Sequence, residues 1–299
     1  MTYILLCILM NVLIYVNFRC FPKFKINTVQ AIIINYFFCV IASLFFQNEF
    51  SFGSETTWKP LIVAFLLGVF FIVNFILISK TTAKMGISVA SIATKLSLII
   101  PVLVSLLFIK SQFRVFDFFN YSGIFLALPA LALGSLQKQD KSVKGLKNIN
   151  YLILPFTIFF LSGAIDAIIN LSNYYLLKNS TEALFIITIF SFSSITGICY
   201  LIYRKEKIKV KNVIAGFLLA VPNYFALWFL IKSLSVFEND GSLVYPSVNI
   251  GIILLASLVS LIFFKDHLSF WNKIGIILSV ISIFLIYHQE ILNYFSRIL

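Results

Sequence analysis

The chain has 299 residues, of which 61% are hydrophobic and only 11% are charged. About a quarter of a typical soluble domain is charged, so this composition excludes an ordinary soluble protein and indicates an integral membrane protein. The formal net charge of +12 does not indicate nucleic-acid binding, because the Lys and Arg residues fall in short clusters between apolar runs. Such basic clusters are typical of loops that contact anionic lipid headgroups, which we expect as partners.

Ten apolar runs are long enough to cross a bilayer as helices, for which about 20 residues are needed. A chain in lipid must satisfy its own backbone hydrogen bonds, and continuous runs of this length favour helices over a barrel. The predicted fold class is therefore an all-α integral membrane protein with ten transmembrane helices. The runs cover residues 2–18, 28–47, 60–79, 85–109, 118–137, 150–177, 183–203, 212–231, 241–264 and 270–288.

An internal repeat divides the chain into two halves. The segments GISVASIATKLSLIIPVLVSLLFIK (86–110) and GSLVYPSVNIGIILLASLVSLIFFK (241–265) match at an offset of 155 residues. We predict a five-helix repeat over 1–137, a basic polar linker over 138–149 and a second five-helix repeat over 150–299. Because five is odd, the second repeat enters the membrane from the opposite side. Inverted repeats with a site near the midplane recur among secondary transporters.

These features resemble the drug/metabolite transporter superfamily, particularly its EamA-type and rhamnose-transporter-like members. The resemblance covers nearly the whole chain. It rests on KMGISVASIATKLSLIIPVLVSLLFIK, on the following GIFLALPALALG, and on the later GSLVYPSVNIGIILLASLVSLIFFKDHLSFWNKIGIILSVISIFLIY. It implies that the first, third, fourth, sixth, eighth and ninth helices line one cavity. The chain departs from the family at Lys110 and Lys265, which stand where a Glu is common.

Two charges lie deep inside predicted spans. Lys95 is about 15 Å from the start of its helix, and Asp166 is near the middle of its own. An isolated Lys at mid-membrane costs roughly 3 kcal/mol on insertion scales, so such residues usually face a polar interior. Two opposite charges at similar depth favour pairing, because a pair is less costly to bury than either charge alone.

Polar residues at helical spacing accompany these charges. Ser91 precedes Lys95 by four residues, and Asp166, Asn170 and Asn173 share one face of their helix. Each of these polar residues could instead join helices without binding anything, and a Lys–Asp pair could be a static clamp. The predicted substrate-binding residues are Lys95, Asp166, Asn74, Asn170, Asn173, Asn223, Tyr245, Asn249, Ser91 and Asn11.

The sequence therefore predicts a secondary active transporter in the cytoplasmic membrane, which moves a small polar metabolite by alternating access. Lys95 would bind an anionic or hydroxyl-rich group, and Asp166 would balance it and carry a coupling proton. The alternative is a non-transporting membrane scaffold or receptor. We do not expect an enzyme, because His267 and His288 stand in no catalytic motif. The cysteines are scattered, and we expect no metal and no cofactor.

The charge bias of the loops and the family resemblance differ on orientation. Outside Lys95, 16 Lys and Arg residues fall on one side of the ten predicted spans and 6 on the side that holds both termini. Positive residues favour the cytoplasm, so this bias predicts that the termini lie outside. The resemblance implies that they lie in the cytoplasm.

Overall fold

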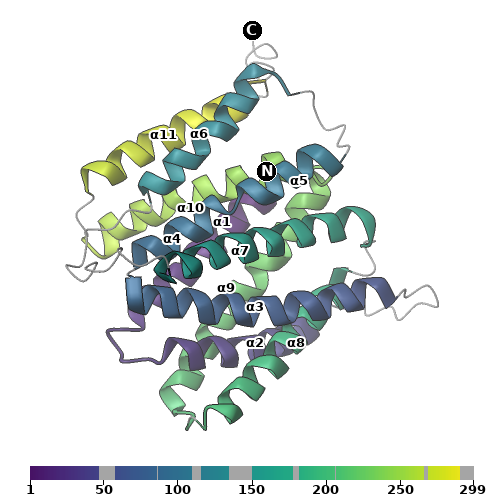
Figure 1. Cartoon of the computed structure of the whole chain (residues 1–299), viewed down its shortest axis with the longest axis vertical. Coiled ribbons are helices and arrows are strands. Elements are labelled where there is room, and N and C mark those ends of the chain that lie inside the picture. The colour runs from purple at the N-terminus through teal and green to yellow at the C-terminus, as the bar shows by residue number, and fades with distance from the viewer. Residues whose placement is uncertain are drawn as a thin grey trace.

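The computed structural model of the protein describes residues 1–46, 58–85, 87–109, 116–134, 150–177, 182–205, 207–265 and 269–289. Within these ranges the chain forms helices and no strand, and the helices lie side by side as a bundle (Figure 1). They are α1 (Thr2–Cys20), α2 (Thr28–Phe46), α3 (Trp58–Met85), α4 (Ile87–Leu96), α5 (Ile99–Phe108), α6 (Phe118–Gly134), α7 (Asn150–Tyr175), α8 (Glu182–Tyr203), α9 (Val210–Val236), α10 (Gly241–Phe263) and α11 (Phe270–Ile286).

Seven of these helices are long and apolar enough to cross a membrane, namely α1, α2, α3, α7, α8, α9 and α10. Three shorter apolar stretches cover residues 92–108, 118–133 and 270–286 and coincide with the fourth, fifth and tenth predicted spans. The prediction of an all-helical, membrane-embedded protein is confirmed. The predicted linker 138–149 lies outside the described residues.

The prediction of one continuous helix over 85–109 is wrong. The segment is broken between Leu96, where α4 ends, and Ile99, where α5 begins. Pro101 explains the position of the break, since proline has no N–H and its ring clashes with the carbonyl four residues earlier. That carbonyl belongs to Ser97, and it accepts a 3.0 Å hydrogen bond from the Ile100 N–H instead. Lys95 therefore lies one residue before a helix end.

A glycine lets α7 pack closely against this break. A Cβ atom on Gly163 would lie 2.8 Å from the carbonyl oxygen of Ser97 and within 2.4 Å of the Ile100 side chain. Only a residue without a side chain fits at this crossing. The close approach brings the middle of α7, including Asp166, beside the end of α4.

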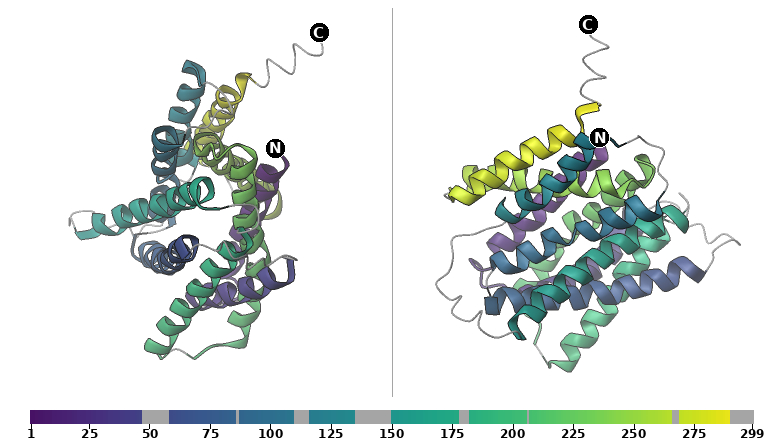
Figure 2. Two further views of the ribbon diagram at one scale, coloured as in Figure 1. Left: turned by 90° about the vertical axis from the view of Figure 1, so that its right-hand side faces the viewer. Right: turned by 45° about the horizontal axis from the view of Figure 1, so that its top comes forward.

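The helices pair across the two predicted halves of the chain. α9 packs against α1 and α2, and α3 packs against α7 and α8. α2 contacts α8, α5 contacts α10, and α6 forms a close pair with α11 at one edge of the bundle (Figures 1 and 2). Helices from one predicted half therefore lie mainly against helices from the other.

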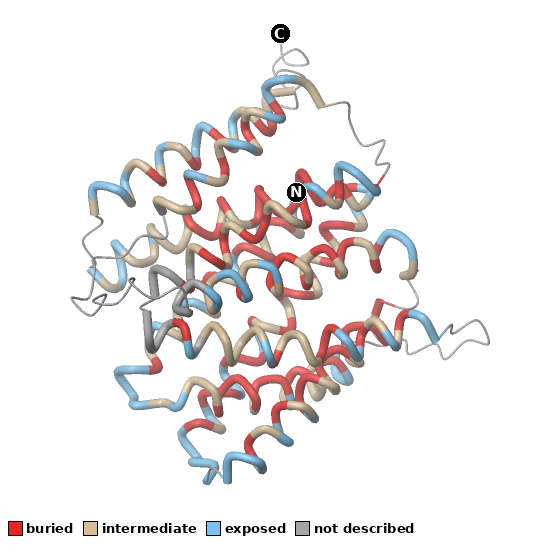
Figure 3. The backbone as a smooth tube through the Cα atoms, in the orientation of Figure 1, coloured by how far each residue is buried: buried red, intermediate tan, exposed pale blue. Residues whose placement is uncertain are grey.

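Three helices of the bundle, α1, α7 and α10, are packed differently at their two ends. We call the end where α1 and α10 begin and α7 finishes the Met1 end, and the end where Arg19 lies over the Phe264 ring the Arg19 end. In α1 and α10, the buried residues run from the Met1 end to just past the middle of the helix, and the last are Val12 and Ile253. In the described part of α7, Ile158 is the one buried residue before Ser162. Buried segments, red in Figure 3, gather in the interior of the bundle.

Candidate functional site

Lys95 is the centre of a polar cluster in the middle of the bundle. Its side chain is 8% exposed, and its Nζ atom donates a 2.9 Å hydrogen bond to Oδ1 of Asn249 on α10. The same atom lies 5.5 Å from the ring centroid of Tyr15 on α1, within the range of a cation–π contact. The adjacent end of α4 also favours a cation, because the carbonyl end of a helix carries partial negative charge.

α10 connects this lysine to α7. The Asn249 amide donates to the Tyr245 carbonyl at 3.0 Å, and this bond leaves Asn249 Oδ1 facing Lys95. The Tyr245 hydroxyl donates a 2.6 Å hydrogen bond to the backbone carbonyl of Asp166. Asn249 and Tyr245 are four residues apart on one face of α10, as their spacing predicts. Asn249 and Tyr245 of α10 thus link α4 to α7 through hydrogen bonds.

Asp166 and Lys95 do not form the predicted direct ion pair. The salt bridges among the described residues join Lys232 to Glu182 and His288 to Asp117. Lys95 bonds to Asn249 instead, because that amide oxygen reaches it from α10. Asp166 is half-buried. Among the described residues, it interacts with Lys95 through longer-range electrostatic attraction and not through a direct contact.

Two further predicted residues border this cluster. Asn11 lies one helical turn before Tyr15 and donates a 2.9 Å hydrogen bond to the Cys7 carbonyl of its own helix. Asn74 donates at 2.9 Å to the hydroxyl of Ser162, one turn before Asp166, and so joins α3 to α7. Ser91 is in α4, but its side chain lies outside the described residues.

The other three asparagines predicted to bind substrate do not contact Lys95. Asn173 donates to Oδ1 of Asn239 at 2.6 Å, beyond the end of α9. Asn223 lies beside the buried Cys39 of α2, with 3.8 Å between its Nδ2 and the sulfur. Asn170 is fully buried against Gly241, and neither of its amide atoms has a hydrogen-bond partner among the described residues. Asn173 and Asn223 thus contact neighbouring helices and loops at other places, and Asn170 packs against the start of α10.

Three residues that shape the cluster are not among the predicted substrate-binding residues: Tyr15, Ser162 and Gly163. A signal for two of them is present in the sequence. Tyr15 follows Asn11 by four residues, and Ser162 precedes Asp166 by four, so each shares a helical face with a predicted residue. No such signal marks Gly163, whose importance depends on the approach of the α4–α5 break.

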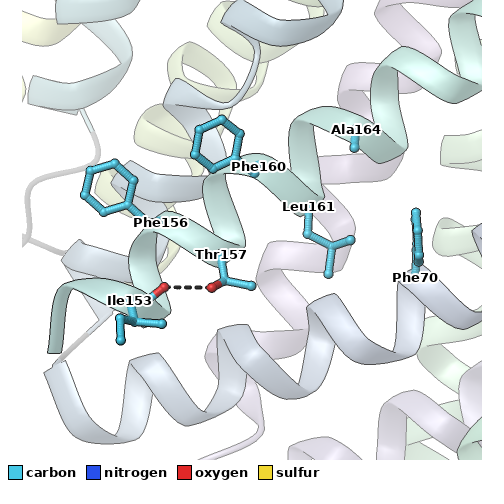
Figure 4. A pocket seen from close by; sticks show the side chains of 7 residues that line it. All are labelled: Phe70, Ile153, Phe156, Thr157, Phe160, Leu161 and Ala164. Carbon is cyan, nitrogen blue, oxygen red and sulfur yellow. Dashed lines mark hydrogen bonds between the residues drawn. The ribbon is translucent and has the colours of Figure 1, made fainter. Parts of the chain in front are cut away.

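An apolar groove of about 760 Å³ lies between α3 and α7 (Figure 4). Its one hydroxyl, on Thr157, is bonded to the Ile153 carbonyl of the same helix at 2.8 Å. The groove therefore suits hydrocarbon chains and does not suit a polar metabolite. It is lined by Phe70, Ile153, Phe156, Thr157, Phe160, Leu161 and Ala164. The described residues contain no group of three or more His, Cys, Asp and Glu side chains able to hold a metal ion.

No family model matches the chain. An uncharacterized protein of Haemophilus influenzae is 28% identical over 301 residues, which cover 96% of this chain and 98% of that protein. A crystal structure of a protein with 11% sequence identity superimposes with a TM-score of 0.68 and covers 95% of this chain and 97% of that chain. At that identity the likeness is one of fold. The chain thus shares its helical fold, over nearly its whole length, with a protein of very different sequence.

Proposed function

We propose that the protein is a secondary active transporter of a small polar metabolite, working by alternating access in the cytoplasmic membrane. The observation that carries this proposal is the pair of charged residues Lys95 and Asp166 on the neighbouring helices α4 and α7, in the middle of a largely apolar bundle. Charges at this depth are costly and usually mark a substrate or ion pathway. The proposal includes ten spans in two inverted repeats and membership of the EamA-type drug/metabolite transporters.

The helix contacts support the inverted repeat. If the first half of the chain is exchanged for the second, α1 takes the place of α7, α2 of α8, and α3 of α9. The packing of α9 on α1 and α2 then becomes the packing of α3 on α7 and α8. A pseudo-two-fold axis between the halves produces such an exchange, and the α2–α8 and α6–α11 pairs would lie across that axis.

The broken helix supports a binding site at Lys95. Discontinuous helices place backbone groups and charged side chains at the centre of many transporters, where a continuous helix would present only its sides. The α4–α5 break occurs at this depth, and Lys95 lies directly before it. The neighbouring residues Tyr15, Asn249 and Asp166 come from three other helices, so movement of those helices would alter the site.

The one-sided packing supports a conformation that is closed toward the Met1 end. Near that end the Gly241 N–H of α10 donates to the Ser105 hydroxyl of α5 at 2.8 Å, and the Tyr175 hydroxyl of α7 donates to the Phe108 carbonyl at 2.9 Å. Access to Lys95 would then come from the Arg19 end. By the positive-inside rule that end faces the cytoplasm, where its basic loops would contact anionic headgroups.

A flux measurement tests the proposal. The purified protein in liposomes is expected to move a metabolite found by thermal-shift screening, and Lys95→Met is expected to abolish that movement. Thr157→Val in the apolar groove serves as a folded control with unchanged flux. If Asp166 carries a coupling proton, Asp166→Asn should remove the dependence of flux on a pH gradient. A ligand that binds at Lys95 but never crosses the membrane would instead support the receptor alternative.

A further inference from the structure

The apolar groove between α3 and α7 opens to the outside of the bundle. Ile153, Phe156 and Phe160 on its α7 wall are 58%, 59% and 59% exposed. Its one hydroxyl, on Thr157, is already bonded within α7. In Figure 4, Ile153 lies at one end of the groove and Phe70 at the other. In a membrane-embedded bundle this surface meets hydrocarbon, so a lipid chain can enter the groove without displacing any hydrogen bond.

The length and depth of the groove match one leaflet of a bilayer. Its α7 wall runs from Ile153 to Ala164, a helical rise of about 16 Å. The hydrocarbon core of a bilayer is about 30 Å thick, so the groove extends through half of it. Because α7 begins at the Arg19 end, the groove runs from that end to the middle of the bundle, where Asn74 bonds to Ser162. A single acyl chain of one leaflet occupies the same depth.

A lysine at the Arg19 end of α3 is placed to bind the headgroup of such a lipid. Lys80 is exposed and lies just beyond the apolar span of α3, which ends at Ile78. It is about 15 Å along the helix from Phe70, at the inner end of the groove. The ion pairs among the described residues do not include it. Lysine side chains at helix ends reach the headgroup region, where they attract anionic lipids.

We propose that the groove binds one anionic phospholipid, with an acyl chain between α3 and α7 and the headgroup phosphate at Lys80. This inference goes beyond the proposed function and does not depend on transport. The other occupant to consider for an apolar membrane surface is a second copy of the chain. The groove favours the lipid, because it extends through half of the membrane, whereas the helices of a second subunit would pack along the whole span.

Native mass spectrometry of the delipidated wild-type protein tests the proposal. The protein is titrated with phosphatidylglycerol or with phosphatidylcholine that has the same acyl chains. We expect one retained lipid per chain and about 5-fold tighter binding of phosphatidylglycerol, which corresponds to about 1 kcal/mol for one lysine near the headgroups. Inorganic phosphate should not compete, because it has no acyl chain. Equal affinity for the two lipids, or competition by phosphate, would overturn the proposal.

Two lysine variants locate the headgroup. Lys80→Gln should give the two lipids the same affinity, because the charge that distinguishes them is gone. Lys273→Gln, at an exposed lysine near the start of α11, is the matched control and should keep the preference for phosphatidylglycerol. If Lys80→Gln keeps that preference as well, the headgroup does not bind at Lys80 and the proposal is wrong.

Two further variants locate the acyl chain. Ala164→Phe, which fills the inner end of the groove, should abolish the retention of either lipid. Val280→Phe, on the outer surface of α11, is the control and should retain the lipid as the wild type does. Equal melting temperatures without lipid show that both variants fold. Undiminished lipid retention by Ala164→Phe would overturn the proposal. A dimer that Ala164→Phe dissociates would also overturn it, because the groove would then be a subunit interface.

Discussion

The two halves of α10 both contain leucine, but their leucines have very different surroundings. Toward the Met1 end Leu243 is fully buried, whereas toward the Arg19 end Leu258 is 54% exposed. α1 shows a similar contrast on its packed face, where Ile8 is buried and Tyr15 is 42% exposed. In a bilayer, lipid and protein interior are equally apolar to a leucine, so hydrophobicity does not decide which half of a helix is buried. The contrast therefore reports how closely the neighbouring helices pack around each half of α1 and α10.

A leucine-to-alanine substitution at each end of α10 tests most directly whether the two ends differ in packing. Leu243→Ala should destabilise the protein by about 2–5 kcal/mol, because the surrounding packed side chains cannot fill the cavity. Leu258→Ala, the matched control, should change stability by no more than about 0.5 kcal/mol. Unfolding in mixed micelles measures both. Similar losses at the two positions would mean that the Arg19 end is packed as tightly as the Met1 end.

A second substitution probes the point where α7 passes from its loose half to its packed half. Gly163→Ala should cost about 1–3 kcal/mol, because the new methyl group meets the Ser97 carbonyl, which belongs to the backbone and cannot rotate away. Ala164→Val, directed into the apolar groove, is the control. It should be tolerated within about 0.5 kcal/mol. The same unfolding experiment measures both variants. If Gly163→Ala is tolerated, α7 does not approach the Ser97 carbonyl as closely as described.

The Met1 end can be weakened by removing one hydrogen bond between α5 and α10. Ser105→Ala leaves the Gly241 N–H without the hydroxyl that accepts from it, at an expected cost of about 1 kcal/mol. Ser279→Ala is the control, since that buried hydroxyl donates to the Gly275 carbonyl of its own helix. If the bond helps to close the Met1 end, Ser105→Ala should also raise the labelling of Tyr15→Cys by an impermeant thiol reagent added on that side. Unchanged labelling would argue against this.

The smallest effect is expected where α6 and α11 meet at the Met1 end. Partial desolvation acts to raise the pKa of Asp117, but hydrogen bonds from the Asn120 backbone, Gln289 and His288, with the charge of His288, hold that pKa below its usual range. A lowered pKa adds stability that is present above about pH 3.9 and is lost as the pH falls through the folded-state pKa. The melting temperatures of wild type and Asp117→Asn should therefore differ slightly at neutral pH and converge in acid. A difference that persists in acid would contradict this.

The helices were predictable because hydrocarbon forces each span to satisfy its own backbone hydrogen bonds. Predicted and observed bounds agree within a few residues for α1 and α2, and Asn249 and Tyr245 share a face as their spacing requires. The partner of Lys95 was not predictable in the same way. Spacing fixes which residues share a face, but the rotation of that face toward α7 or α10 depends on the packing of neighbouring helices.

The sequence by itself determined that the protein is an all-helical membrane protein, where most of its helices lie, and that Lys95 and Asp166 are deep within predicted spans. These properties follow from local composition and from the length of apolar runs. The tertiary structure decided that Lys95 bonds to Asn249, that Asn170, Asn173 and Asn223 lie elsewhere, and that the Met1 end is the closely packed one. Each of these depends on the rotation and approach of helices, which small residues such as Gly163 control and apolarity does not.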